Sequence, residues 1–134
     1  GHQEAYAAAG LPHDPGWIMN CGSTVKGGYQ GALDLLGQHP ELDAIFCYND
    51  LAAVGALKAC MQLGKRVPAD IAIAGHDDIP LAELVTPALT TCCVPRYELG
   101  RQAAQALLDQ VQGCQEGCGE ITMTAELVAR ASAP

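Results

Sequence analysis

The stretch that decides the fold is DAIFCYNDLAAVGALKACMQLGKRVPADIAIAG, residues 43–75. Its start, over 43–48, is a compact apolar run of strand length bounded by turn-forming residues, and it predicts a short strand. Residues 51–63 then predict a helix that ends at Gly64, and residues 71–75 predict a second strand. Short strands that are apolar along their length and alternate with helices are typical of a parallel sheet covered by helices.

The predicted helix over 51–63 is apolar on nearly every side. Only Lys58 and Gln62 interrupt its apolar character, and their i, i+4 spacing gives the helix one polar stripe. A helix of this kind must be covered on more than one side, by the sheet and by a second subunit.

The flanking segments continue the same alternation. We expect further helices or strands over 24–37, 81–84, 86–94, 96–112 and 120–130. The predicted fold class is therefore α/β, with a doubly wound parallel sheet, and 134 residues suffice for one such domain. Ligands of such sheets bind beyond the carboxyl ends of the strands, where Asn49-Asp50 and His76-Asp77-Asp78 fall in this chain.

The charge argues against nucleic-acid binding by this segment. The formal net charge is −8, and the seven basic residues are scattered singly or in one pair, so no basic stripe is available to hold phosphates. No apolar run approaches the ~18–20 residues of a membrane helix, and the amino terminus lacks a secretory signal. We therefore expect a cytoplasmic segment with no membrane partner.

The cysteines favour ordinary reduced thiols. The chain has seven cysteines without regular spacing, which is atypical of a secreted disulfide framework. Cys114 and Cys118 are spaced like half of a zinc site, but no second Cys or His pair lies nearby at ligand spacing. That zinc interpretation stays a minor alternative.

The sequence contains no motif typical of a catalytic or metal site. Three consecutive side chains such as His76, Asp77 and Asp78 rarely reach one metal ion, because neighbours on extended backbone point in opposite directions. Adjacent carboxylates do not flank a substrate bond as glycoside hydrolysis requires, and nucleophile, zinc-protease and phosphate-loop motifs do not occur. We expect no catalytic residue, no metal and no cofactor.

The polar residues after the strands have two interpretations, helix capping and ligand binding. Capping is favoured for Asp50 and Asp78, which both precede helical segments. Asn49 and Asp77 suit a polyhydroxylated ligand, because a carboxylate accepts hydrogen bonds while an amide both donates and accepts. For Asn49, capping also remains open.

Taken together, these motifs resemble a known family. Over some 65 residues the chain is similar to the effector-binding core of the lactose/galactose-repressor (LacI/GalR) family of transcription regulators. The similarity rests on the order and spacing of Asn49-Asp50, Ala53-x-Gly55, Val67-Pro68-x-Asp70-Ile71, Gly75-x-Asp77-Asp78, Pro87-x-Leu89-Thr90-Thr91, Pro95 and Leu99-Gly100.

The resemblance implies a partial, periplasmic-binding-protein-like type I lobe. Residues 1–94 would belong mostly to the second lobe, 95–112 would form a helix crossing to the first lobe, and 120–130 would return as a strand. Family members are two to three times longer and carry an amino-terminal helix-turn-helix, which this chain lacks. Operator DNA would be reached only through that missing domain.

The resemblance also assigns residues. It implies that Asn49 and Asp77 bind the effector, and that the segments 24–37, 51–63 and 81–85 form the face of a homodimer. The chain departs from the family at Ser23, where an aromatic residue is common, at His76, and at Cys93-Val94, where polar residues are common.

Ser23 and a further residue, Arg96 just after Pro95, bear on the ligand. Ser23 and Arg96 join Asn49 and Asp77 as candidate ligand-binding residues, and Arg96 would suit an anionic effector, although it could equally be a solvent-exposed residue at a helix start. His76 has no assigned role.

The expected function is binding of a small effector, a sugar, sugar acid or purine, that controls operator binding allosterically. A solute-binding protein of sugar transport with the same architecture is the alternative.

Overall fold

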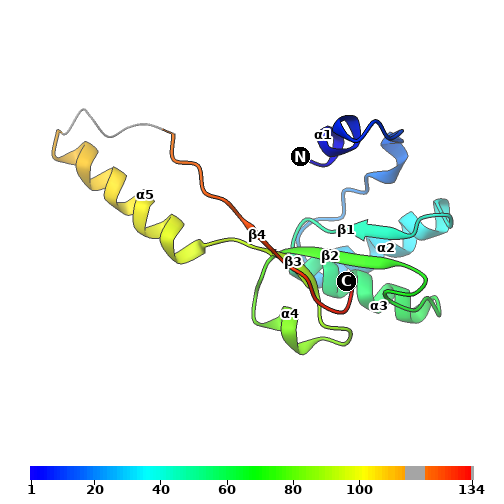
Figure 1. The fold of residues 1–134 in the computed structure, drawn as a ribbon. Helices are drawn as coiled ribbons and strands as arrows, with labels where there is room; N and C mark the ends of the chain where they lie inside the picture. Colours follow the sequence, from blue (N-terminus) through cyan, green and yellow to red (C-terminus); the bar gives the residue numbers. More distant parts are fainter. Residues whose placement is uncertain (114–119, 134) are drawn as a thin grey trace.

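The computed structural model describes residues 1–113 and 120–133. Helices and strands alternate along the middle of the chain, as the sequence predicts (Figure 1). The elements are α1 (His2–Ala8), the 3₁₀ helix η1 (Pro15–Trp17), α2 (Val25–Gln38), β1 (Ala44–Phe46), α3 (Asp50–Gln62), β2 (Ala72–Asp77), α4 (Leu81–Leu84), β3 (Thr90–Cys93), α5 (Arg96–Val111) and β4 (Glu126–Val128).

The strands form one four-stranded sheet in the order β1-β2-β3-β4. β1, β2 and β3 are parallel, with Ala44 opposite Ala72 and Ala74 opposite Thr90, whereas β4 runs antiparallel to β3. The predicted α/β class with a parallel sheet is confirmed. The strand expected over 120–130 is shorter than predicted and comprises only Glu126–Val128.

The core lies between the sheet and the helices α2 and α3. Ile71, Ile73 and Leu89 have no exposed surface, and they contact the small residues of α3, such as Ala53 and Cys60, which are equally buried. The other face of β1 is open, and Phe46 is 55% exposed there.

Glycines set the close approach of α2 to α3. A Cβ at Gly28 would overlap the carbonyl oxygen of Ala52, and a Cβ at Gly55 would overlap the carbonyl oxygen of Val25. The two helix backbones therefore touch at these positions. Gly37 of α2, in contrast, has open space where its Cβ would stand.

Asp50, the first residue of α3, is fully buried and bonds to the turn after β2 and to β3. Its carboxylate accepts from the backbone N–H of Ile79 at 2.8 Å and from the hydroxyl of Thr91 at 2.6 Å. Asp50 follows β1, Ile79 follows β2 and Thr91 lies in β3, so one side chain links the three parallel strands. A Cβ at Gly75 would collide with this carboxylate, which explains a glycine inside β2.

The last described residues form hydrogen bonds to β2 and β3. Ser132 is fully buried, and its hydroxyl accepts from the backbone N–H of Thr90 at 2.8 Å and donates to the carbonyl of Ile73 at 2.6 Å. The hydroxyl of Thr90 in turn donates to the carbonyl of Ala133 at 2.8 Å. Residues 130–133 are therefore an integral part of this unit.

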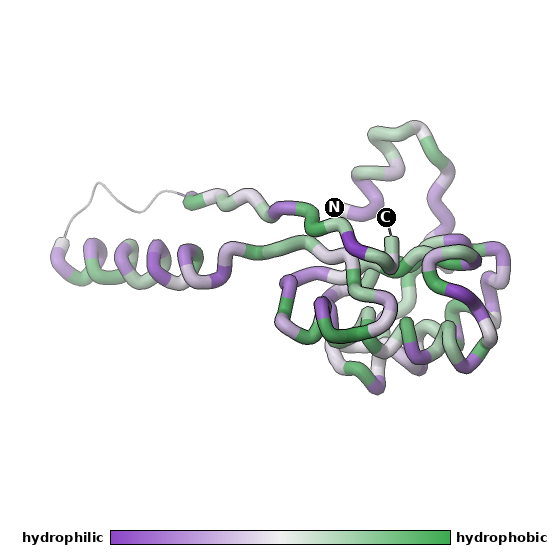
Figure 2. The backbone as a smooth tube through the Cα atoms, turned by 60° about the horizontal axis from the view of Figure 1, so that its bottom comes forward, coloured by the Kyte–Doolittle hydropathy of each residue, from purple (hydrophilic) through white to green (hydrophobic). Residues whose placement is uncertain are grey.

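Helix α5 projects away from the rest of the described chain (Figure 1). None of its residues is buried, and polar and apolar residues alternate along it (Figure 2). Its apolar side chains are largely exposed, at Leu99, Leu107, Leu108 and Val111.

The cysteines in the core behave as small apolar residues. Cys47 and Cys60 are buried, and burial raises the pKa of the Cys47 thiol to about 12, so it stays protonated at neutral pH. Cys114 and Cys118 lie outside the described residues. Among the residues that are described, no group of three or more His, Cys, Asp or Glu side chains could hold a metal ion.

We expect Gly55→Ala to lower the free energy of unfolding by about 2 kcal/mol or more, because the added methyl group meets rigid backbone of α2. Gly37→Ala is the matched control, and we expect it to raise the free energy of unfolding by up to about 1 kcal/mol through helix propensity alone. Urea denaturation of both variants measures the difference, and equal effects would contradict the close helix contact.

We expect Asp50→Ala to cost about 3 kcal/mol of unfolding free energy, because it leaves the Ile79 N–H and the Thr91 hydroxyl buried without their acceptor. Asp34 is an exposed carboxylate on α2, and Asp34→Ala should change stability by less than about 0.5 kcal/mol. Denaturant titrations compare the two, and a small effect of Asp50→Ala would argue against its linking role.

Candidate functional site

The polar residues singled out in the sequence meet at one edge of the sheet. Because β1, β2 and β3 are parallel, their carboxyl ends lie together. Asn49 follows β1, Asp77 is the last residue of β2, and Arg96 follows β3. This edge is the candidate functional site.

Asn49 is the N-cap of α3. Its side-chain oxygen accepts from the N–H of Ala52 at 2.9 Å, and its Nδ2 donates to the carbonyl of Ser23 at 3.1 Å. The capping interpretation is therefore right for Asn49, and the structure brings Asn49 and Ser23 together. One N–H of the amide and one acceptor lone pair remain for a ligand.

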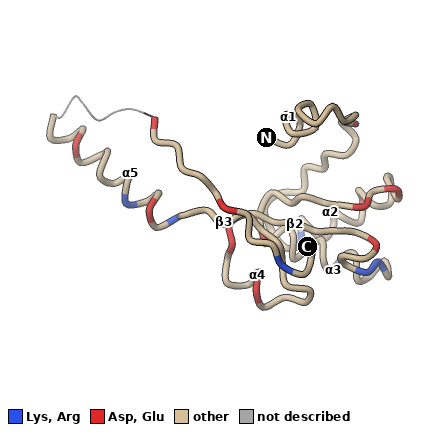
Figure 3. The backbone as a smooth tube through the Cα atoms, in the orientation of Figure 1, with Lys and Arg blue, Asp and Glu red and all other residues tan. Residues whose placement is uncertain are grey.

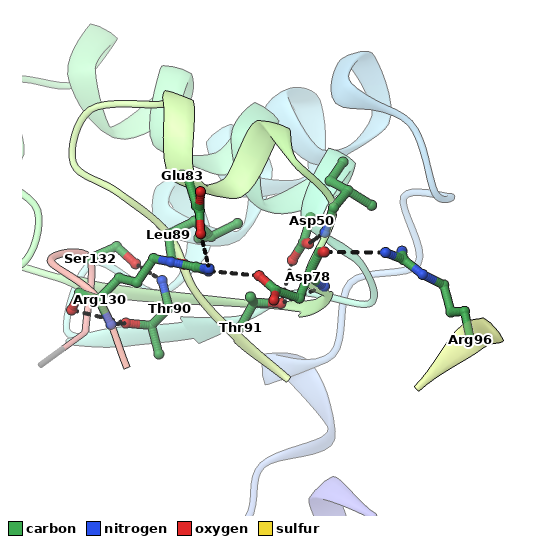
Figure 4. A network of polar contacts seen from close by, with 10 residues as sticks. Asp50, Asp78, Glu83, Leu89, Thr90, Thr91, Arg96, Arg130 and Ser132 are labelled. Atoms are coloured by element: carbon green, nitrogen blue, oxygen red, sulfur yellow. Dashed lines mark hydrogen bonds and ion pairs between the residues drawn. The ribbon is translucent and has the colours of Figure 1, made fainter. Parts of the chain in front are cut away.

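The interpretation of Asp50 and Asp78 as caps of the helices that follow them is wrong. Asn49 caps α3, which leaves Asp50 to accept from Ile79 and Thr91. Asp78 does not cap α4, which has no side-chain cap hydrogen bond. Instead its Oδ1 pairs with Nη1 of Arg130 at 2.8 Å (Figure 4).

The turn formed by Asp77 and Asp78 has an unusual backbone. Their φ values are 109° and 52°, in a backbone region that residues other than glycine rarely adopt. Such conformations cost of order 1–3 kcal/mol each and persist only where surrounding contacts enforce them. The Asp50 bond to Ile79 and the Arg130 bond to Asp78 are such contacts on either side of the strained backbone.

Asp77 is a partly exposed acceptor at this edge. Its side chain is 37% exposed, and among the described residues its carboxylate contacts the ring of His76, with Nδ1 and Oδ1 3.2 Å apart. The two oxygens of one carboxylate can accept from two neighbouring hydroxyls of a ligand.

His76 also lines a pocket of about 290 Å³ where the chain leaves the sheet for α5. The other lining residues are Val94, Pro95, Leu99, Met123 and Ala125. None of the four predicted ligand-binding residues lines this pocket. Two features of the sequence point to this pocket: His76 stands beside Asp77, and it departs from the family pattern.

Arg96 points back toward the strained turn. Its Nη2 donates to the carbonyl of Asp78 at 3.2 Å (Figure 4). Cys93 lies close to the same turn, and burial together with the Asp78 carboxylate raises the pKa of its thiol, so the thiol stays neutral. Apart from the pair Lys65-Arg66, the basic residues are scattered over the described chain and form no single cluster (Figure 3).

Comparison with known proteins supports the resemblance seen in the sequence. The model of the periplasmic binding protein-like domain matches residues 1–133. The HTH-type transcriptional repressor CytR of Escherichia coli K12 is 39% identical over 132 residues, which cover 98% of this chain and 39% of the repressor. The chain thus spans about two fifths of that relative's length.

Solved structures agree with this assignment. The transcriptional regulator CelR in its cellobiose complex has a TM-score of 0.94 and 31% identity, over 98% of this chain and 40% of that one. A LacI-family regulatory protein from Chloroflexus aggregans has a TM-score of 0.89 and 33% identity, over all of this chain and 48% of that one. The chain belongs to the periplasmic-binding-protein-like domains and, among them, to the effector-binding cores of the LacI/GalR family.

Proposed function

We propose that this chain is the effector-binding and dimerisation part of a transcription regulator whose operator affinity changes when the effector binds. Membership of a family whose matched relatives are repressors carries this proposal. Binding would shift an equilibrium between two arrangements of the protein, and the dimer would pass that shift to a DNA-binding domain. Such a regulator works in the cytoplasm, acts on DNA only through that separate domain, and is not an enzyme.

Asp77 is the residue on which we base effector recognition. It is exposed at the strand end, and burying its charge under a ligand is tolerable only if the ligand supplies hydrogen-bond donors. Vicinal hydroxyls of a sugar supply two. CelR was solved with cellobiose bound, which supports a sugar for this chain too.

The other candidate residues have smaller roles in this proposal. Asn49 keeps one N–H for the ligand while it caps α3, and the Ser23 hydroxyl lies in the loop that Asn49 holds. Arg96 spends one N–H on the Asp78 carbonyl and keeps other N–H donors that could bind an anionic effector. A sugar is favoured for this chain by the sugar bound in CelR, and a sugar acid or a purine remains an alternative.

The shape of the chain supports a division into lobes. Residues 1–94 would form most of the second lobe, 95–112 would cross to the first, and 120–130 would return. The exposed apolar residues of α5 need cover, and a first lobe would supply it.

A dimer would cover a second apolar surface, on α3 and α4. Met61 is 75% exposed and Leu84 is 78% exposed, and a groove of about 360 Å³ lies between α3 and the segment that follows α4. The groove is lined by Val54, Leu57, Lys58, Met61, Lys65, Val67, Val85, Thr86 and Pro87. The nearly all-apolar sequence of α3 requires cover on this outer side.

A solute-binding protein of sugar transport is the alternative with the same architecture. The repressor and regulators found among the relatives favour transcriptional control. None of the helices in the described ranges is long and apolar enough to cross a membrane.

A thermal-shift screen of the full-length protein tests the proposal. The probes are ribose, lactose, cellobiose, gluconate and hypoxanthine, since a ligand that binds only the folded state raises the melting temperature. A sugar should give the largest shift, and the same sugar should change operator binding in a gel shift. The chain of 134 residues alone should bind no operator.

We expect Asp77→Ala and Asp77→Asn in the full-length protein to weaken binding of that sugar about 10- to 100-fold, the cost of losing hydrogen bonds to a charged acceptor. Asn tolerates the left-handed backbone at this position, so Asp77→Asn separates ligand contact from backbone strain. Calorimetry measures the affinity. Unchanged affinity in both variants would show that Asp77 does not contact the effector.

We expect Leu84→Glu to dissociate the dimer, because the charge would be buried in the subunit interface, while the folded monomer tolerates it at an exposed site. Leu11 is 57% exposed outside α3 and α4, and Leu11→Glu is the matched control. Sedimentation velocity at several concentrations reports the oligomeric state. Equal behaviour of the two variants would rule out this dimer face.

A further inference from the structure

One guanidinium connects the strained turn to α4. Arg130 follows β4, its side chain is 13% exposed, and its Nη1 donates to Asp78 Oδ1 at 2.8 Å and to the carbonyl of Leu89 at 3.0 Å. Its Nη2 donates to Glu83 Oε1 in α4 at 3.1 Å (Figure 4). The turn after β2, the residue before β3 and α4 therefore share one cation.

The backbone of Arg130 is anchored independently of its side chain. Its N–H donates to the hydroxyl of Thr90 at 2.8 Å, and Ser132 two residues later bonds into β2 and β3. The guanidinium thus extends from a fixed point toward a turn whose backbone conformation is costly. An anchored cation is suited to hold such a turn in place.

The two ion pairs of Arg130 differ in strength. Asp78 is 21% exposed, so its pair with Arg130 is shielded from water, whereas Glu83 is 71% exposed and its pair is worth little. The planar fork of arginine reaches both carboxylates at once, and a lysine ammonium on a single stem does not reproduce that geometry.

We propose that Arg130 is a positioning residue that sets the place of Asp77 through its neighbour Asp78 and couples this turn to α4. A change at either end is felt at the other, because both ends bind the same group. This inference rests on the proposed function. Under it, Arg130 would couple the candidate effector site near Asp77 to α4, which belongs to the proposed dimer face. Arg96, which donates to the Asp78 carbonyl, brings the start of α5 into the same cluster.

Hydrogen exchange of the full-length protein, without effector, tests the coupling. Glu83→Gln and Asp78→Asn each remove one ion pair of Arg130, and Arg130→Lys keeps the charge but loses the fork. Arg101→Gln is the control, since it removes an exposed ion pair with Glu98 on α5 and touches neither segment. Exchange is followed in peptides that cover 76–80 and 81–85.

Coupling predicts effects across the cluster. Glu83→Gln should raise exchange at 76–80 about two- to fivefold, although Glu83 does not contact that turn, and Asp78→Asn should raise exchange at 81–85 by more. Arg130→Lys should raise exchange in both segments, and Arg101→Gln in neither. Effects confined to the mutated segment, or spread evenly over the whole protein, would overturn the proposal.

The outcome is separable from that of the proposed function. Effector binding and dimerisation are scored by calorimetry and sedimentation, whereas the coupling is scored by exchange in the free protein. Absence of sugar binding would contradict the proposed function and leave the exchange result valid. Sugar affinity that is unchanged in Arg130→Lys would show that Arg130 does not position Asp77.

Discussion

The carboxylate of Asp50 is buried between the turn that follows β2 and Thr91 of β3, and the geometry of the candidate site depends on satisfying it. A buried carboxylate is stable only with donors around it, and Ile79 N–H and the Thr91 hydroxyl are those donors. Meeting this requirement ties the start of α3 to the turn after β2 and to β3. It also excludes a side chain at position 75.

Periodicity in the sequence was sufficient to predict the sheet and its helices. The helices expected over 24–37, 51–63 and 96–112 form within one residue of those bounds, because their apolar spacing and their end signals agree. Long-range partners were not predictable in the same way. The sequence favours a capping role for Asp78 because α4 follows it, whereas its partner Arg130 lies 52 residues further along the chain.

Neighbouring residues at the start of α3 show a second limit of sequence reasoning. Asn49 and Asp50 are both preferred capping residues, so composition could not decide which of them caps. Backbone conformation decides, since Asn49 is extended and Asp50 is already helical. Because of this change in backbone conformation, the Asn49 side chain reaches the N–H of Ala52, whereas the Asp50 side chain points into the core and cannot cap α3.

The polar side chains at the candidate site divide into those whose hydrogen-bonding groups are bound within the described part of the protein and those whose groups remain free. Asn49 uses half of its hydrogen-bonding capacity on α3 and Ser23, and Asp78 is held by Arg130, whereas the Asp77 side chain is partly exposed beside His76. The strained turn directs the two adjacent aspartates differently, since Asp78 pairs with the internal cation of Arg130 whereas Asp77 contacts the ring of His76. Under the proposed function, Asp77 would require hydrogen-bond donors from the effector, and the contacts of Asp78 and Asp50 would keep that requirement in a fixed place.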